Sequence, residues 1–231
     1  MLTGNLRASE HADDTTAVVP PQAPPHLTLV HTPSFYERRG KRAFDFVAGA
    51  LLFAASLPLM ALTALMIRVV MGPGVLYRQE RVGRDGRVFT MLKFRTMDPD
   101  RRQARGDYHG PDRRETHKTI ADPRHTGLGR FLRRSSLDEM PQLLNVLRGD
   151  MSLVGPRPEL TAIVDRHNLW NHPRHAVRPG ITGVWQISPM RNELLHETID
   201  IDLDYLPNIT LMGDLKLLVQ TVVSVIGRAG S

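Results

Sequence analysis

The chain has 231 residues, of which 41% are hydrophobic and none is cysteine. The absence of cysteine excludes disulfide frameworks, thiolate nucleophiles and cysteine-based zinc sites. The 30 Lys and Arg residues outnumber the 24 Asp and Glu residues, and the resulting net charge of +6 favours anionic partners such as nucleic acid, anionic lipid or phosphorylated small molecules. Taken alone, this charge is equally consistent with a basic surface that only keeps the protein soluble and binds no anionic partner.

Residues 1–34 are predicted to form a disordered, Pro-rich tail. They lack the basic region and apolar run of a signal peptide, and they contain Asp13, Asp14 and the stretch Pro20-Pro21-Gln22-Ala23-Pro24-Pro25. Such a composition buries too little apolar surface to fold.

An uncharged apolar run follows, from Phe46 to Ile67. As a straight helix its 22 residues would be about 33 Å long at about 1.5 Å per residue, which matches a bilayer core of about 30 Å. A soluble core helix of this length would normally show a polar stripe, and none is visible. Insertion into a membrane is therefore predicted.

The run is predicted to enter the membrane and return to the same face rather than to span it. Pro58 should kink the helix, and Ser56 could donate a hydrogen bond to a carbonyl freed by the proline. A spanning helix usually has its basic excess on one side, whereas here both sides are basic. The flanking residues are Arg38, Arg39, Lys41 and Arg42 before the run, and Arg68, Arg78, Arg81 and Arg84 after it.

Three parts are thus expected: the tail at 1–34, a re-entrant membrane helix hairpin kinked at Pro58 at 35–71, and a catalytic domain at 72–231. In the last part, strands at 75–77 and 88–92 should form a hairpin around Asp85-Gly86. Residues 98–121 are expected to form a surface loop. Helices are predicted at 128–134, 139–147, 159–169, 194–205 and 214–226. The predicted fold class is α+β: a mostly helical, membrane-associated domain with a small β-hairpin. The last helix is amphipathic and could cover the core or lie at the membrane surface.

The densest group of functional candidates lies at residues 128–159. Asp138 and Glu139 stand where a helix should begin, either with Ser136 and Glu139 as a capping box or with Asp138 as the cap. Because a helix N-terminus favours anions, a carboxylate here should stay ionised and could act as a nucleophile or a metal ligand. A plain helix cap remains the structural alternative.

Basic residues surround this pair in the sequence. Arg130, Arg133 and Arg134 share one face of the preceding helix, as a phosphate clamp would. Arg157 is held between Pro156 and Pro158, which lowers the cost of fixing it against an anion. Lys93 and Arg95 end the second predicted strand and could reach the same pocket.

Other chemistries fit these residues less well. Neighbouring helix residues point about 100° apart, so Asp138 and Glu139 cannot bracket one glycosidic bond. Mg²⁺ is more plausible, because it binds carboxylates beside phosphates. His167, His172 and His175 lack a matching carboxylate and are expected to be surface histidines. Aromatic residues make up 6% of the chain and are not interleaved with the basic runs, so nucleic acid is not an expected partner.

Six sequence stretches, in order over about residues 38–227, resemble the bacterial sugar transferase family, the monotopic phosphoglycosyl transferases. They are Lys41-Arg42-Ala43-Phe44-Asp45, Arg78-Gln79-Glu80-Arg81-Val82-Gly83, Lys93-Phe94-Arg95-Thr96-Met97, Ser136-Leu137-Asp138-Glu139-Met140-Pro141-Gln142, the run Gly149-Asp150-Met151-Ser152-Leu153-Val154-Gly155-Pro156-Arg157-Pro158, and Arg178-Pro179-Gly180-Ile181-Thr182-Gly183. One departure is that Leu57, rather than a serine, precedes Pro58.

The resemblance implies transfer of a sugar 1-phosphate from a nucleotide sugar, with UDP expected by analogy, to polyprenol phosphate, as the first step of glycan or exopolysaccharide assembly. It also implies a covalent phosphosugar-enzyme, Mg²⁺ dependence, and an inner (cytoplasmic) membrane location with the catalytic domain on the cytoplasmic face. Larger relatives carry an additional N-terminal spanning domain, so the chain resembles the minimal form of the family.

The same resemblance assigns roles to single residues. Asp138 would be the nucleophile and Glu139 its partner in a catalytic dyad. Phosphate or nucleotide contacts are expected from Lys93, Arg133, Arg157 and Arg178, and metal binding from Asp138 and Asp202.

A catalytically silent membrane scaffold that recruits later glycosyl transferases is the alternative from another class. Downstream glycosyl transferases are also possible partners of an active enzyme. The intact Asp138-Glu139 pair and the set of arginines argue for an enzyme. The sequence leaves the sugar open among glucose, galactose and N-acetylated amino sugars.

Overall fold

The computed structural model describes residues 33–97, 126–192 and 198–229. The predicted tail, but for residues 33 and 34, and the predicted loop at 98–121 therefore lie outside the described residues, as does the start of the helix expected at 194–205.

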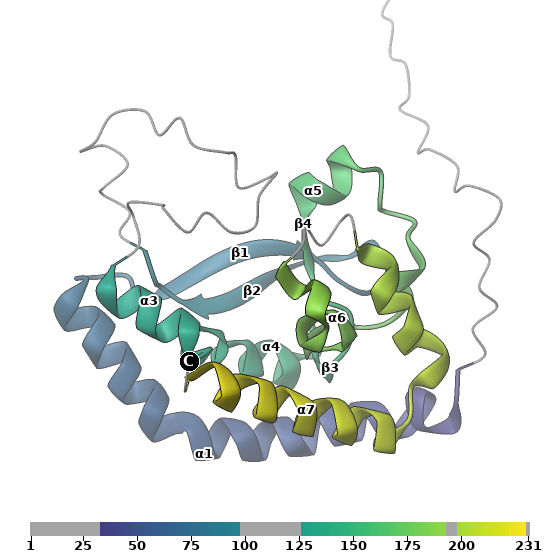
Figure 1. Cartoon of the computed structure of the whole chain (residues 1–231), viewed down its shortest axis with the longest axis horizontal. Coiled ribbons are helices and arrows are strands. Elements are labelled where there is room, and N and C mark those ends of the chain that lie inside the picture. The colour runs from purple at the N-terminus through teal and green to yellow at the C-terminus, as the bar shows by residue number, and fades with distance from the viewer. Residues whose placement is uncertain (1–32, 98–125, 193–197, 230–231) are drawn as a thin grey trace, which may run out of the picture.

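A long apolar helix runs beneath the rest of the molecule (Figure 1). A π-helical turn, η1 (Tyr36–Gly40), leads into α1 (Lys41–Val70), which stays one continuous helix through Pro58. Figure 1 shows α1 bent near the middle of its length. Ser56 donates to the carbonyl of Phe53 at 2.9 Å, not to that of Ala54, the carbonyl that a proline at position 58 deprives of its partner.

Much of the apolar surface of α1 is left uncovered by the described residues. Its apolar window has a mean hydropathy of 2.2, and 11% of that window is buried, so α1 is long and apolar enough to enter or cross a membrane. The exposed large apolar side chains of α1 are Phe46, Val47, Leu51, Leu52, Leu57, Leu59, Leu62, Leu65, Val69 and Val70. A solvent-facing helix would not carry such a surface.

Polar contacts fix the first turns of α1 to the remainder of the protein. Lys41 forms a 2.7 Å ion pair with Asp214, whose side chain is fully buried. Arg42 donates to the carbonyls of Val146 and Leu147 at 2.7 and 2.9 Å, in the last turn of α4 (Gln142–Arg148), where carbonyls lack helical partners. These contacts hold α1 across the underside of α4.

The predicted hairpin is confirmed, with longer strands. Strands β1 (Leu76–Val82) and β2 (Val88–Phe94) pair antiparallel, and both Asp85 (φ 55°) and Gly86 (φ 71°) adopt the positive φ that the tight turn requires. A third strand, β4 (Glu159–Leu160), pairs antiparallel with β1, so β2 lies at one edge of the sheet.

A buried asparagine of α4 covers that edge. Asn145 accepts from the Leu92 N–H at 3.0 Å and donates to the Thr90 carbonyl at 2.8 Å. Because Asn145 is fully buried, these bonds satisfy groups that would otherwise be stranded at the edge of β2. They fix α4, and the turn before it, against the sheet.

Two short strands form a second, parallel sheet that was not predicted: β3 (Ser152–Val154) and β5 (Gly180–Thr182). Beside this sheet, the backbone around Gly155 packs directly against that of Gly180 and Gly183, because glycine has no side chain. A Cβ on Gly180 would lie 2.1 Å from the backbone N of Gly155, and one on Gly183 would lie 2.1 Å from the Gly155 carbonyl oxygen. The contact brings residues 155–158 against residues 178–183.

The remaining helices agree only partly with the expected ones. They are α3 (Gly127–Arg134), α5 (Thr161–Arg166), α6 (Val184–Ile187), α7 (Leu211–Ala229) and the 3₁₀ helices η4 (Pro173–Ala176), η5 (Pro189–Asn192) and η6 (Ile199–Asn208), besides the short turn before α4. The expected helix at 159–169 was wrong at its start, because residues 159 and 160 pair with β1 as a strand. The main core cluster, which includes Met91, Val146, Val154 and Leu206, lies among α4, β2, β3 and the end of η6.

Candidate active site

Asp138 and Glu139 lie in a short 3₁₀ turn, η3 (Leu137–Glu139), just before α4. Both expected caps were wrong. Ser136 makes no side-chain cap hydrogen bond, and Pro141 rather than Asp138 occupies the N-cap position of α4. Ser136 instead adopts the left-handed conformation (φ 58°), uncommon for a residue with a side chain. This turn separates α3 from α4 and presents the two carboxylates beside the end of β2.

Glu139 is paired with Lys93, which projects from β2. The Nζ–Oε1 distance is 2.8 Å, and the exposed fractions of the two side chains are 16% and 25%. Burial alone would raise the pKa of Glu139, but the nearby charges of Lys93 and then Arg157 outweigh burial and hold this pKa at about 2. Glu139 is therefore ionised throughout the physiological pH range.

Asp138 differs from its neighbour in being 8% exposed. Burial, assisted by the charge of Glu139, raises its pKa to about 6, while Lys93 and Arg133 act in the opposite direction. The expectation of a carboxylate that stays ionised at neutral pH holds by a narrow margin, because a group with a pKa near 6 is still about nine-tenths ionised at pH 7. The two adjacent carboxyls thus have different pKa values because their surroundings differ: about 2 for Glu139 and about 6 for Asp138.

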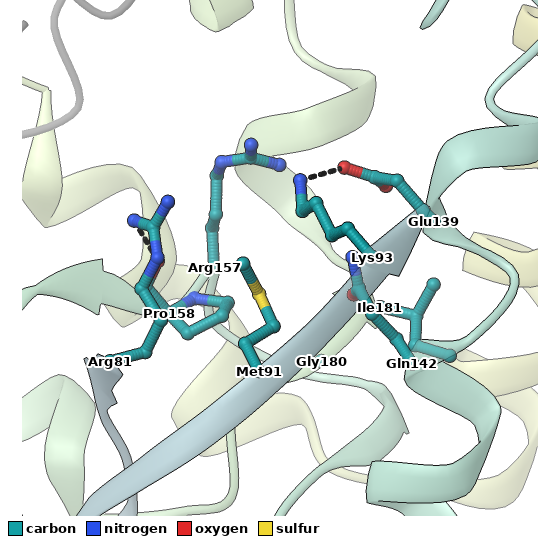
Figure 2. A pocket seen from close by; sticks show the side chains of 9 residues that line it. All are labelled: Arg81, Met91, Lys93, Glu139, Gln142, Arg157, Pro158, Gly180 and Ile181. Carbon is teal, nitrogen blue, oxygen red and sulfur yellow. Dashed lines mark hydrogen bonds and ion pairs between the residues drawn. The ribbon is translucent and has the colours of Figure 1, made fainter. Parts of the chain in front are cut away.

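A small pocket opens beside Glu139, and Asp138 is not among its lining residues (Figure 2). Its lining residues are Arg81, Met91, Lys93, Glu139, Gln142, Arg157, Pro158, Gly180 and Ile181. Figure 2 shows the tip of Arg157 turned toward Lys93 and Glu139, with Arg81 on the other side of Pro158. Lys93 and Arg157 face the single carboxylate of Glu139, whereas Arg81 is opposed by Glu159 at 3.5 Å, so the pocket keeps an excess of positive charge, as a phosphate site requires.

Arg81 is a pocket residue that the sequence reasoning did not single out for the site. Its guanidinium donates to the Pro158 carbonyl at 3.2 Å and lies 3.5 Å from the fully buried carboxylate of Glu159. Burial lowers the pKa of Arg81 to about 10, so it remains charged. Arg81 follows Arg78, Gln79 and Glu80 in one polar run of β1, so the sequence alone does not mark it as the buried charge.

Other predicted residues lie outside this pocket. Arg133 is exposed on α3, close enough to Asp138 to lower its pKa. Arg178 donates from Nε to the Gly149 carbonyl at 2.9 Å and is not among the pocket-lining residues. Arg95 donates to the carbonyls of Met71 and Gly72 at 2.6 and 3.0 Å, just after the end of α1. The expectation that it reaches the shared pocket was therefore wrong.

Asp202, Arg174 and His175 are buried in a separate region. Asp202 forms a 2.6 Å ion pair with Arg174, and both side chains are 1% exposed. His175 is buried, and its burial lowers its pKa to about 4, so the expectation of a surface histidine was wrong there; His167 is exposed. His172 lies 3.4 Å from Asp200.

Asp138 and Asp202 differ in how well they could hold Mg²⁺. The described part of the chain contains no group of three or more His, Asp or Glu side chains able to hold a metal ion. Mg²⁺ usually binds one or two carboxylates together with substrate phosphates, and Asp138 fits that pattern. Asp202 fits less well, because its Oδ2 already accepts from Arg174 and from the Arg157 N–H and its side chain is 1% exposed, which leaves only the buried Oδ1 for an ion. Its metal role stays a prediction.

Comparison with known proteins agrees with the family resemblance. A family model described as bacterial sugar transferase matches residues 36–228. The UDP-glucose:undecaprenyl-phosphate glucose-1-phosphate transferase of Caulobacter vibrioides is 43% identical over 194 residues, which cover 80% of this chain and 69% of that protein. The undecaprenyl-phosphate galactose phosphotransferase of Salmonella typhimurium is 38% identical over 83% of this chain but 41% of its own length. The exopolysaccharide production protein ExoY of Rhizobium meliloti is 37% identical over 83% of this chain and 87% of its own length.

Proposed function

Because the chain belongs to the bacterial sugar transferase family, we propose that it transfers a sugar 1-phosphate from a UDP-sugar to polyprenol phosphate. This reaction begins the assembly of an exopolysaccharide or another glycan. The names of the relatives support the lipid phosphate as acceptor, and they include both glucose and galactose as sugars. The sugar is therefore left open.

The observation that carries this proposal is the contrast between Asp138 and Glu139. Glu139 is an ionised carboxylate paired with Lys93 at 2.8 Å, whereas Asp138 is a buried carboxylate with a raised pKa of about 6. A raised pKa makes a carboxylate more nucleophilic while leaving most of it ionised at neutral pH. Glu139 serves the site by holding Lys93 in place and by keeping the pKa of Asp138 raised.

The proposed reaction has two displacements at phosphorus. A carboxylate oxygen of Asp138 attacks the phosphorus that carries the sugar, the bond to the bridging oxygen breaks, and UMP leaves with the electron pair. An oxygen of polyprenol phosphate then attacks the same phosphorus, and the aspartyl oxygen leaves as the free carboxylate. Lys93, Arg157 and Arg133 offset the charge on the phosphates, which is the main requirement of phosphoryl transfer.

We propose Asp138 as the protein ligand of Mg²⁺, together with oxygens of the bound diphosphate. When bound there, the ion would neutralise diphosphate charge. The remaining work of binding and orienting the donor falls to the cations of the pocket.

The proposed location is a membrane face rather than a transmembrane arrangement. Both ends of α1 contact the same globular part: Lys41 pairs with Asp214 at one end, and Arg95 holds the Met71 carbonyl at the other. A straight spanning helix places its ends on opposite sides of a bilayer core about 30 Å thick. The bent α1 and its paired ends support entry and return at one face, which we take to be cytoplasmic because the nucleotide sugar is found there.

The direct test uses the purified protein with undecaprenyl phosphate and a panel of UDP-sugars, with UMP release as the measurement. Release with one sugar and not the others would identify the donor. No release with any donor, in the presence of Mg²⁺, would contradict the proposed function and favour a scaffold. The covalent step is tested separately by exchange of labelled UMP into the UDP-sugar without lipid: the wild type should catalyse it and Asp138→Asn should not.

A further inference from the structure

The buried pair of Arg174 and Asp202 has no part in the chemistry described so far. It lies in the segments 173–176 and 199–208, its charged atoms are 2.6 Å apart, and each side chain is 1% exposed. Burying two charges is costly even when they pair, and hydrophobic residues of similar volume often stabilise a fold equally well. The pair therefore calls for a role beyond stability.

Its contacts converge on the main chain of one residue, Arg157. The Arg157 N–H donates to Asp202 Oδ2 at 3.3 Å, and Arg174 Nη2 donates to the Arg157 carbonyl. Pro156 and Pro158 on either side have no N–H and a fixed φ. Both hydrogen-bonding groups of the Arg157 backbone are thus held by a single ion pair, in a segment whose neighbours can rotate little.

The side chain of Arg157 is held from another direction. Its Cζ lies 5.5 Å from the ring centroid of Trp185, on α6, and the indole N–H donates to Thr198 Oγ1 at 2.9 Å. Beyond the ring, the guanidinium reaches the pocket shared with Lys93 and Glu139 (Figure 2). Arg174 and Asp202 are absent from that pocket's lining and their side chains are 1% exposed, so their contacts with Arg157 are the direct link between them and a ligand in the pocket.

We propose that Arg174 and Asp202 are positioning residues, which fix the backbone of Arg157 so that its guanidinium is preorganised to bind the diphosphate of the nucleotide sugar. The inference rests on the proposed transferase function. A guanidinium fixed before binding loses less conformational entropy when it meets a phosphate. Asp202 accordingly acts through Arg174 and Arg157 rather than as a ligand of a metal ion.

The principal test is a coupling experiment on the full-length protein. Three variants are compared with the wild type: Arg157→Ala, the apolar pair Arg174→Met with Asp202→Leu, and all three changes together. Loss of a charge-assisted hydrogen bond to phosphate should raise the KM for the UDP-sugar about tenfold to hundredfold in Arg157→Ala. The apolar pair should fold, raise this KM by a large part of that factor with a smaller change in kcat, and add almost nothing once Arg157 is alanine.

A matched buried ion pair elsewhere supplies the control. Lys41→Met with Asp214→Leu removes a pair of similar burial that contacts α1 rather than Arg157. This variant should shift the melting temperature but leave the donor KM near that of the wild type. Equal KM increases in both double variants, or an effect of the Arg174 and Asp202 changes that multiplies with that of Arg157→Ala, would overturn the inference in favour of a general structural role.

Asp202→Asn keeps the inference testable if the apolar pair fails to fold. Asparagine retains an oxygen that can accept from Arg157 and Arg174 but loses the charge, so a smaller rise in donor KM is expected, again absent in an Arg157→Ala background. The Mg²⁺ concentration for half-maximal activity should not change; a large increase would contradict the inference and support a metal ligand. A wild type without activity would instead contradict the proposed function.

Discussion

The burial that raises the pKa of Asp138 also lowers the stability of the fold at neutral pH. Its pKa is raised to about 6 from a usual value near 3.8, first by burial and then by the charge of Glu139. The folded protein therefore holds a proton on this carboxyl more tightly than the unfolded chain does. The stability that this group contributes is fully present below about pH 4 and is lost as the pH rises through about 6.

Asp138→Asn should consequently abolish transfer yet stabilise the protein. A neutral amide escapes the cost of burying the anion, so the free energy of unfolding at pH 7.5 should rise by about 1 to 3 kcal/mol, which corresponds to a few degrees in melting temperature. The measurement is thermal unfolding in detergent at pH 7.5 and at pH 4, where the advantage should vanish. A variant no more stable than the wild type at pH 7.5 would show that Asp138 is not strained by burial.

The two partners of Asp138 should shift its pKa in opposite directions. Glu139 raises this pKa and Lys93 lowers it. In the profile of kcat/KM against pH, Glu139→Gln should move the acidic limb, which the wild type should show near pH 6, to lower pH, and Lys93→Met should move it to higher pH. Both variants should lose activity at the optimum, so the position of the limb is the informative quantity. Limbs that move together would mean that another group titrates.

Among the helices, strands and turns, the sequence predicted those features that neighbouring residues determine. The Asp85-Gly86 turn was predictable because few residues tolerate two successive positive φ angles. Gly149 ends α4 at a single positive φ of 95°, which glycine adopts without strain. The helix start at Glu159 was mispredicted because tertiary contacts decide it. Glu159 pairs with Val82 across the sheet and lies beside Arg81, some 80 residues away in sequence.

The candidate site shows the same division. Lys93, Glu139 and Arg157 were identifiable from their motifs, and the structure places them around one pocket. Arg174 was not, because an arginine among histidines in a loop gives no sign of being buried. The role of Asn145 could have been predicted, because an amide within an apolar helical run needs hydrogen-bond partners when it is buried.

The bend of α1 makes a prediction about topology. Replacing Pro58 with leucine restores a helix hydrogen bond to the Ala54 carbonyl and removes the ring that clashes with it. The straightened helix should span the bilayer in part of the population. Because the chain has no cysteine, single cysteines at the exposed positions Arg39 and Val88 can be labelled with an impermeant maleimide in intact cells and in inverted vesicles.

In the otherwise wild-type protein, both cysteines should react only in inverted vesicles. In Pro58→Leu, the cysteine at position 39 should become partly reactive from outside, while that at position 88 should not. Labelling of position 39 from outside without the Pro58 change would establish a spanning helix and contradict re-entry.

At the scale of the whole molecule, one buried carboxylate joins the two ends of the described chain. Asp214, at the start of α7, is fully buried and accepts from Lys41 at 2.7 Å and from the hydroxyls of Tyr36 and Tyr205 at 2.8 Å each. Tyr205 also donates to the Val154 carbonyl, in β3. The apolar helix α1, the last helix and the parallel sheet thus meet at a single buried carboxylate.

Removing that charge should loosen the molecule without touching its chemistry. Asp214→Asn leaves the buried Lys41 ammonium without its counter-charge, and breaking one side of a buried pair typically costs about 3 to 5 kcal/mol. We expect a clear fall in melting temperature in detergent, whereas the pH dependence of kcat/KM on the folded protein should match that of the wild type, because Asp138 and its partners are unchanged. Asp200→Asn, at an exposed acidic residue paired with His172, is the control and should leave the melting temperature nearly unaltered. An Asp214→Asn protein as stable as this control would mean that lipid or detergent, rather than the buried network, holds α1 in place.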